Sequence, residues 1–360
     1  MKALGHCNVT GIGSLPFTNI SEGHELIRNS FPKIPHWPQL PKLGDAEGFI
    51  NQYLNLPIKI GLVKIAQGRT PYFDTERADF TNLLTEFYTI YLEAIEGNKH
   101  ALNEFSFGNN AKGFKTFLDK ASDGFYDQAE VFKGQVSGPI TLGLQITDLN
   151  RKASYYNDQL RDVLVKTLAL HGKWQAQQLL TLGKPVVIFI DDPGLYSLGL
   201  STHITLTRTG IMRDLAEIIE STASTGAVVG SHTCASTDWS MLFELNIKIV
   251  NFDSYLYFSS LSTQIEAIRK FLEKDGILAF GLIPTSENVL TETAQSLTNL
   301  FSQQLDILVK KGINEKKLVE QVMLTPSCGT GSLTTNMAIT VYELTKAVGG
   351  KVKERYNLSK

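Results

Sequence analysis

The chain has 360 residues, of which 42% are hydrophobic and 19% are charged, so it can bury a large core as one big domain or two small ones. Its formal net charge at pH 7 is −2 and no basic run is interleaved with aromatic residues, so we expect no binding to nucleic acid. Three cysteines, a start without a signal-peptide pattern and the lack of a long apolar run favour a cytoplasmic protein that binds no membrane.

Short runs rich in β-branched and aromatic residues alternate along the chain with longer helical patterns. Eight such strand and helix units are typical of an α/β fold of the (β/α)8 TIM barrel kind. A doubly wound open sheet is the alternative, but no glycine-rich dinucleotide loop follows a strand and opens a helix. The predicted strands cover residues 7–14, 101–107, 131–138, 185–191, 226–232, 247–253, 277–283 and 322–327.

An insertion is predicted after the first strand, because about ninety residues separate it from the second, more than one strand and helix unit requires. The stretch PHWPQLPKLG is punctuated by prolines and should be extended, while LPIKIGLVKIAQGRTPYFDT indicates two strands joined around AQGRT. We therefore expect a single domain over residues 1–360, with an insertion at approximately 35–98 whose hairpin lies over one mouth of the barrel.

The segment SHTCASTDW places a histidine and a cysteine two residues apart. His232 ends a predicted strand, Cys234 follows it, and Cys328 follows the last predicted strand. The C-terminal ends of barrel strands meet at one rim, so these side chains should be neighbours. Two thiolates and an imidazole are ligands that Zn²⁺ prefers. A cysteine alone more often behaves as a small buried hydrophobe, which is the alternative for each thiol.

Five motifs together resemble the catalytic barrel of cobalamin-independent methionine synthase: TGIGSLP, GQVSGPITL, VVIFIDDP, HTCASTDW and TPSCGTGSL. The resemblance spans essentially the whole chain and takes in the wider superfamily that contains uroporphyrinogen decarboxylase and the zinc-dependent corrinoid-to-thiol methyltransferases. It implies a Zn²⁺ ion that is held by His232, Cys234 and Cys328 and binds a substrate thiol. The family's fourth ligand is a glutamate, and this sequence has Asp253 at that position. Asp253 is one methylene shorter, and it is a candidate both for the fourth ligand and for a catalytic role.

The resemblance also implies how the amino-acid end of homocysteine is bound. Ser14 matches a serine that contacts this end, and Asp191 matches the acid that holds the substrate ammonium and is a further catalytic candidate. Asp192, Gln135 and Thr141 are expected to line the same pocket. From the residues alone, the alternative for Ser14 is a tight turn, and the alternative for the paired aspartates is a helix-capping turn.

The methyl donor is expected to differ from that of the folate-using synthases. Those enzymes carry a second, N-terminal barrel, of which these 360 residues hold no counterpart, and a histidine that matches none of Pro284, Thr285 and Ser286. A folate amine must be protonated before it leaves. We therefore expect a zinc-dependent thiol methyltransferase that makes methionine from homocysteine with a methyl-corrinoid, brought by a carrier protein. The alternatives are a methyltransferase or lyase for another thiol, such as coenzyme M, and a barrel that binds metal or ligand without turnover.

Overall fold

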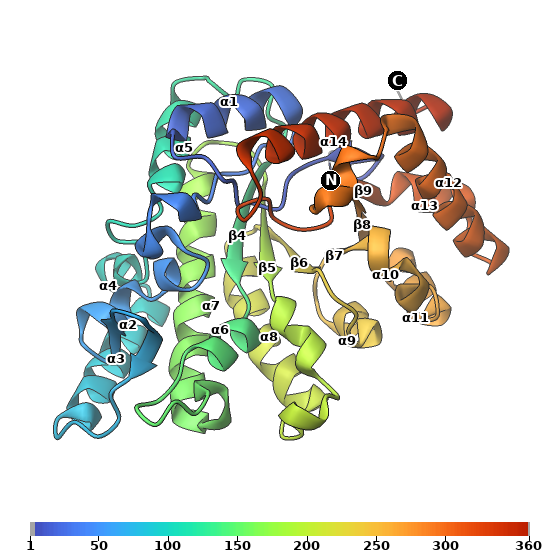
Figure 1. Cartoon of the computed structure of the whole chain (residues 1–360). Coiled ribbons are helices and arrows are strands. Elements are labelled where there is room, and N and C mark those ends of the chain that lie inside the picture. Colours follow the sequence, from blue (N-terminus) through green and yellow to red (C-terminus); the bar gives the residue numbers. More distant parts are fainter. Residues whose placement is uncertain (1–3, 359–360) are drawn as a thin grey trace.

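The computed structural model describes residues 4–358, which form a curled sheet of seven parallel strands surrounded by helices (Figure 1). The strand order is β1-β9-β8-β7-β6-β5-β4, so neighbours in space are neighbours along the chain, apart from β1 beside β9. This order lacks the reversal that defines a doubly wound sheet. The parallel α/β prediction is thus confirmed. The strands are β1 (Asn8–Val9), β4 (Phe132–Ser137), β5 (Val186–Asp191), β6 (Val228–Thr233), β7 (Ile249–Phe252), β8 (Ile277–Ile283) and β9 (Val322–Pro326).

Helices follow the strands and cover the outer face of the sheet (Figure 1). Side chains cap several of their N-termini; Asn157, for example, accepts hydrogen bonds from the N–H groups of Gln159 and Leu160 at the start of α7. The inner face carries its own small apolar layer, which includes Val187, Phe189 and Met323. The helices are α1 (Ile20–Ser30), α2 (Asn55–Lys59), α3 (Phe80–Ile95), α4 (Lys99–Glu104), α5 (Lys112–Ser122), α6 (Pro139–Gln145), α7 (Asp158–Leu180), α8 (Arg208–Ala223), α9 (Trp239–Glu244), α10 (Ser254–Leu261), α11 (Ile265–Glu273), α12 (Ala294–Lys310), α13 (Glu315–Glu320) and α14 (Thr335–Arg355).

The predicted strand at 101–107 is wrong, because this stretch begins inside helix α4. The side chain of Asn98 accepts hydrogen bonds from the N–H groups of His100, at 3.0 Å, and Ala101, at 3.3 Å, and so starts the helix. Leu102 and Phe105 are buried at helical spacing. The run therefore packs as a short helix and the loop after it.

Residues 33–40 lie between the two edge strands of the sheet, β4 and β1. The N–H of Lys133 donates to the carbonyl of Pro35 at 3.0 Å, and the N–H of Gln39 donates to the carbonyl of Gly13 at 3.0 Å. The segment forms only isolated parallel bridges with these strands, because its prolines lack the N–H groups that a continuous ladder requires.

A side chain supplements this backbone pairing at the edge of β4. Gln175, on α7, accepts a hydrogen bond from the N–H of Gln135 at 3.0 Å and donates one to the carbonyl of the same residue at 3.0 Å. Its oxygen also accepts from the indole N–H of Trp37 at 3.0 Å. The Gln175 amide thus pairs with both backbone groups of one strand residue, as a neighbouring strand would.

Two further strands, β2 (Val63–Ala66) and β3 (Arg69–Phe73), form a separate antiparallel pair. Two of the hydrogen bonds that join the pair to the loop after α6 are between backbone groups: the N–H of Phe73 donates to the carbonyl of Thr147 at 2.8 Å, and the N–H of Thr147 donates to the carbonyl of Pro71 at 3.3 Å. Within residues 4–358, no helix has both the length and the apolar character needed to cross a membrane.

Candidate metal centre

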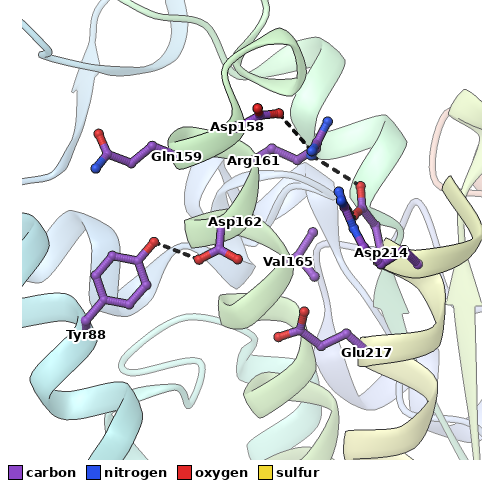
Figure 2. Close-up of a pocket in the computed structure, with 9 residues that line it drawn as sticks. Tyr88, Asp158, Gln159, Arg161, Asp162, Val165, Asp214 and Glu217 are labelled. Carbon is purple, nitrogen blue, oxygen red and sulfur yellow. Dashed lines mark hydrogen bonds and ion pairs between the residues drawn. The ribbon is translucent and has the colours of Figure 1, made fainter. Parts of the chain in front are cut away.

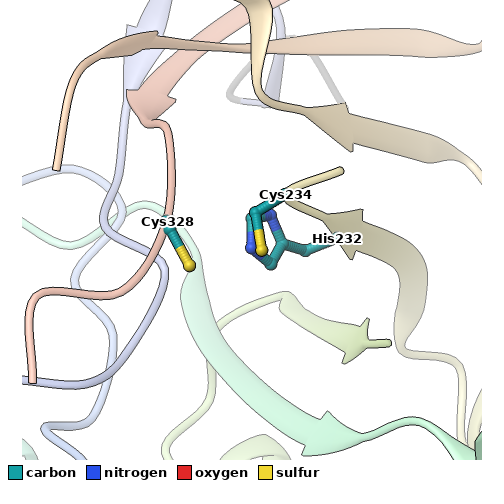
Figure 3. A group of neighbouring side chains, drawn as sticks. All are labelled: His232, Cys234 and Cys328. Carbon is teal, nitrogen blue, oxygen red and sulfur yellow. The ribbon is translucent and has the colours of Figure 1, made fainter. Parts of the chain in front are cut away.

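The side chains of His232, Cys234 and Cys328 meet at the C-terminal ends of β6 and β9. One ligand atom from each residue lies within 4.8 Å of the others. Figure 3 shows Cys328 approaching from the loop after β9, while His232 and Cys234 enter from the end of β6. The parallel sheet brings these residues together because the strands that carry them end at the same rim.

Asn251 fixes the orientation and the tautomer of His232. Its amide nitrogen donates to the carbonyl of Ala279 at 2.9 Å and to Oγ1 of Thr325 at 2.8 Å. The amide oxygen therefore faces His232 and accepts a hydrogen bond from Nδ1–H. Nε2 of His232 is left with its lone pair, and it is buried without a hydrogen-bond partner. A buried imidazole nitrogen without a partner beside two sulfur atoms fits a soft divalent ion such as Zn²⁺.

The two thiols of the group influence each other's protonation. A hydrogen bond from Cys328 lowers the pKa of Cys234, and His232 lowers it further. The pKa of Cys328 is raised by the same hydrogen bond and by burial. One sulfur is thus close to the thiolate form that binds metal, and a bound cation would favour loss of the second proton.

Asp191 ends β5 and lies beside this group. Its side chain is buried, and Oδ1 has no hydrogen-bond partner. Burial raises the pKa of Asp191 to about 6, while the charges of His232 and Lys133 act in the opposite direction. An acid with an unpartnered oxygen can receive a cationic group of a ligand.

Lys133, in β4, supplies a buried positive charge that the sequence analysis missed. It is fully buried, its Nζ donates to the carbonyl of Ile12 at 2.6 Å, and Nζ lies 4.6 Å from the ring centroid of Phe189. Burial lowers the pKa of Lys133 to about 8, against the attraction of Asp191. Phe132 and Val136 lie on one face of the strand, so Lys133 lies on the other face, which is turned to the inside of the sheet. This alternation is the signal in the sequence that could have identified Lys133.

A cavity of about 280 Å³ opens beside the three candidate ligands, and we call it the inner cavity. Ser14 lies in its wall, where Oγ accepts a hydrogen bond from the N–H of Gly331 at 3.2 Å. A Cβ atom on Gly329 would come within 2.1 Å of Ser14 Oγ, so only glycine permits this approach of the two loops. The lining includes Ser14, Phe49, Asp191, His232, Cys234 and Cys328.

Other predicted site residues have structural contacts instead of lining this cavity. Asp192 accepts hydrogen bonds from the N–H of Ile140 at 3.0 Å and from the N–H and hydroxyl of Thr141 at 2.8 and 2.6 Å. Burial raises the pKa of Asp192 to about 6, although these bonds favour its charge. Asp192 and Thr141 therefore fasten the start of α6 to the loop after β5.

Asp253 and Gln135 are also outside the inner cavity lining. Asp253 caps α10 by accepting a hydrogen bond from the N–H of Leu256 at 2.9 Å, and its carboxylate does not join the three-residue group. Burial raises the pKa of Asp253 to about 6. Gln135 donates to the carbonyl of Trp37 at 3.4 Å, and its side-chain oxygen is buried without a partner.

A larger cavity of about 580 Å³ lies at α3, α7 and α8 and shares no lining residue with the inner cavity (Figure 2). Its charges are paired within the protein. Arg161 contacts Asp158 at 2.9 Å and Asp214 at 3.5 Å, and the hydroxyl of Tyr88 donates to Asp162 at 2.7 Å. The charged groups named here thus have partners within the protein, whereas Asp191 and His232 in the inner cavity each have a buried polar atom without one.

Solved structures resemble this chain over most of its length, and two of them are described here. A B12-independent methionine synthase from Shewanella sp. W3-18-1, in complex with selenomethionine, is 13% identical over 98% of this chain and 99% of that one, with a TM-score of 0.54. A candidate vitamin-B12-independent methionine synthase from Listeria monocytogenes is 14% identical over 93% of this chain and 86% of that one, with a TM-score of 0.51. No family model and no curated protein sequence matches the chain. At these identities the likeness shows a shared fold.

Proposed function

We propose that the protein is a zinc-dependent methyltransferase that methylates the thiol of homocysteine. The observation that carries the proposal is that two thiols and an imidazole nitrogen without a partner meet in a cavity that also contains an unpartnered acid. The shared fold with methionine synthases agrees with this assignment. We also infer that residues 33–40 take the place of the missing second strand of a (β/α)8 barrel.

The inner cavity supports a small amino-acid thiol as the acceptor. Ligand pockets range over roughly 300–1,000 Å³, so a cavity of about 280 Å³ suits a small molecule. In this proposal Asp191 pairs with the substrate ammonium, and Ser14 contacts the amino-acid end. A sulfonate such as that of coenzyme M would need a free cation, but the ammonium of Lys133 already donates to Ile12.

The residues of the chain have distinct roles in the proposed reaction. His232, Cys234 and Cys328 would hold zinc, which when bound would favour the thiolate form of a substrate thiol. Asn251 keeps Nε2 of His232 free of a proton. Asp191 orients the substrate, whose sulfur attacks the methyl carbon. The carbon–sulfur bond forms as the bond from carbon to the donor breaks, its electron pair stays with the donor, and the thiol proton leaves to solvent.

The donor is proposed to be a methyl-corrinoid that arrives on a carrier protein. A folate donor requires a general acid. Pro284, Thr285 and Ser286, in the loop after β8, lie in the stretch where the resemblance to the folate-using enzymes implies a histidine. The hydroxyl of Thr285 lies 3.0 Å from that of Ser327, and Ser327 also accepts from the N–H of Thr285 at 3.2 Å. Because this loop supplies no general acid, it suits a methyl donor whose leaving group needs no proton.

The test is X-ray absorption at zinc in the purified protein, with homocysteine, coenzyme M and cysteine added separately. We expect zinc to gain one additional sulfur neighbour when homocysteine is added, but not when coenzyme M or cysteine is added. The Asp191→Asn variant should keep its zinc but bind homocysteine more weakly, because a hydrogen bond to a charged group contributes about 1.5–3 kcal/mol. A protein that takes up no zinc, or that gains sulfur equally from coenzyme M, would contradict the proposal.

A further inference from the structure

A second large cavity adjoins the inner cavity, and we call it the outer cavity. Its volume is about 780 Å³, and it lies between the segment 41–51, the turn of the β2–β3 pair and the end of α6. Pro41 and Phe49 line both cavities. The two cavities therefore meet at these two side chains.

Hydrogen bonds from the scaffold fix the wall that the cavities share. The carboxylate of Glu47 accepts from the N–H of Lys112, at the start of α5, at 3.1 and 3.2 Å. The carbonyl of Phe49 accepts from the hydroxyl of Ser137, at the end of β4, at 2.7 Å. Because both contacts are with regular elements of the fold, they hold the backbone of this segment in position, and the side chain of Phe49 lies where the cavities meet.

The sizes of the two cavities differ in the way that two substrates of unequal size require. About 280 Å³ lies at the low end of ligand pockets and about 780 Å³ lies well inside their range of roughly 300–1,000 Å³. The outer cavity can therefore receive a cofactor-sized molecule next to a small thiol.

The lining of the outer cavity is apolar and amide-rich, and it offers no free cation. Arg69 is the single basic residue among its lining residues, all of which belong to the described chain. Its Nη2 donates to the carbonyls of Asp148 at 2.7 Å and Leu149 at 3.1 Å, and its guanidinium lies 3.8 Å from the centroid of the Tyr72 ring. The lining also holds one carboxylate, that of the exposed Asp45, which would repel an anionic ligand. The other side chains that remain for a ligand are those of Pro41, Phe49, Ile50, Asn51, Ile65, Gln67, Thr70, Pro71 and Gln145.

This lining distinguishes between classes of methyl donor. The carboxylates of a folate tail or the phosphates of a nucleotide would favour free arginine or lysine side chains. A corrinoid presents an apolar ring face with uncharged carboxamides at its edge. Apolar side chains together with the amides of Asn51, Gln67 and Gln145 match that pattern.

We propose that the outer cavity binds the methyl donor, and that this donor is a corrinoid whose methyl-bearing face is turned toward Phe49. The inference rests on the proposed function, because it places the second substrate of that reaction. The homocysteine sulfur forms a bond to the methyl carbon, the cobalt–carbon bond breaks, its electron pair stays on the corrinoid, and the thiol proton leaves to solvent.

Binding of methylcobalamin to the zinc-loaded full chain tests the location, with equilibrium dialysis as the readout. Ile65 lines the outer cavity and is 52% exposed, so Ile65→Glu should fold normally yet place an unpaired carboxylate against the ring. We expect affinity to fall on the order of tenfold. Leu290→Glu is the matched control, because Leu290 is 65% exposed and lies outside the lining.

The outcomes separate the location of the donor from the proposed function. Wild-type affinity in Ile65→Glu, or an equal loss in both variants, would overturn the assignment of the outer cavity. Zinc–sulfur coordination with homocysteine is measured on the same samples, and failure there refutes the thiol chemistry instead. A parallel titration with methylcobinamide, which lacks the nucleotide tail, distinguishes the source: equal binding supports a corrinoid presented by a carrier, and preference for methylcobalamin supports the free cofactor.

Discussion

The side chain of Asn251 contacts His232, one of the three candidate metal ligands, and determines which nitrogen of that ring is available. Replacing it with leucine removes the acceptor for Nδ1–H of His232, so the proton can move to Nε2. Loss of such a contact typically weakens metal binding about 10–100-fold. We expect this loss in Asn251→Leu, measured by competition with a zinc chelator. Asn251→Asp keeps the acceptor for Nδ1–H but loses the donor to the carbonyl of Ala279, so it should retain more of the affinity than the leucine variant. Equal zinc affinity in the leucine variant and the wild type would refute this role.

Cys328 should be required for stoichiometric zinc. In Cys328→Ser a soft thiolate is replaced by a neutral hydroxyl, so the metal content of the purified protein should fall sharply. Cys7→Ala is the matched control, because Cys7 is a buried cysteine whose thiol contacts the carbonyl of Val319 at 3.7 Å, outside the group. Full zinc occupancy in Cys328→Ser, measured by atomic absorption, would exclude this residue as a ligand.

Homocysteine affinity should depend on pH through Asp191. Its pKa is raised by burial to about 6, and the proposed ammonium partner requires the ionised form. The contribution of this ion pair to affinity should therefore be constant above this pKa and decrease as the pH falls below it, in addition to any dependence that comes from the thiols. Lys133→Met removes a charge that lowers the pKa of Asp191, so the onset should move to higher pH.

The control ligand for this titration is 4-mercaptobutyrate, which has the same thiol without the ammonium. Its affinity should lack the Asp191-dependent step, while any step due to the thiols of the site remains in both profiles. Identical pH profiles for the two ligands would show that Asp191 is not the ammonium partner.

Strand-end geometry was enough to predict the grouping of His232, Cys234 and Cys328, because parallel strands end together. It was insufficient for the neighbouring acids. Successive strand residues point to opposite faces, and the sequence does not say which of Asp191 and Asp192 turns inward. The structure gives Asp191 to the cavity and Asp192 to the start of α6.

Among the elements, the pairing of residues 33–40 with β4 and with the residues after β1 could not be predicted from composition. The prolines in 33–40 remove backbone donors and lower any strand signal, although this segment contacts both edges. The apolar residues in the stretch 101–107 are spaced in a way that is compatible with either a helix or a strand. A cap at Asn98 and contacts with the surrounding aromatic core decide for a helix.

Gln175 is expected to stabilise the fold because it pairs with the backbone of β4. Gln175→Leu leaves the N–H and carbonyl of Gln135 and the indole of Trp37 without this partner. The carbonyl of Gln135 keeps a hydrogen bond from the hydroxyl of Tyr53 at 3.3 Å, so the N–H of Gln135 and the indole are the groups left unpaired. Such groups cost about 1–3 kcal/mol each, so the free energy of unfolding should fall by a few kcal/mol. Urea unfolding measures the change. Gln177→Leu, at an exposed position of the same helix, is the control, and equal losses would argue against a special role for Gln175.

For the whole molecule, the prediction that tests the proposed reaction most directly is which methyl donor the protein uses. Zinc-loaded protein and homocysteine should yield methionine with methylcobalamin and not with methyltetrahydrofolate, since the loop after β8 has no histidine at 284–286. General acid catalysis contributes about 10²–10⁴-fold, so the difference in rate should be at least of this order. Comparable methionine formation from the folate would refute the corrinoid donor and leave the thiol chemistry standing.

Residues 33–40 cover the edge of β4 and so affect whether copies of the chain can associate through it. An open strand edge is a template on which a second chain can add a strand. Here the N–H groups of Val131 and Lys133 donate to Lys33 and Pro35, and that of Gln135 donates to Gln175. Before residues 33–40 have docked, during synthesis or refolding, the same edge is open. The edge of β4 is therefore available for pairing with another chain only until residues 33–40 have docked.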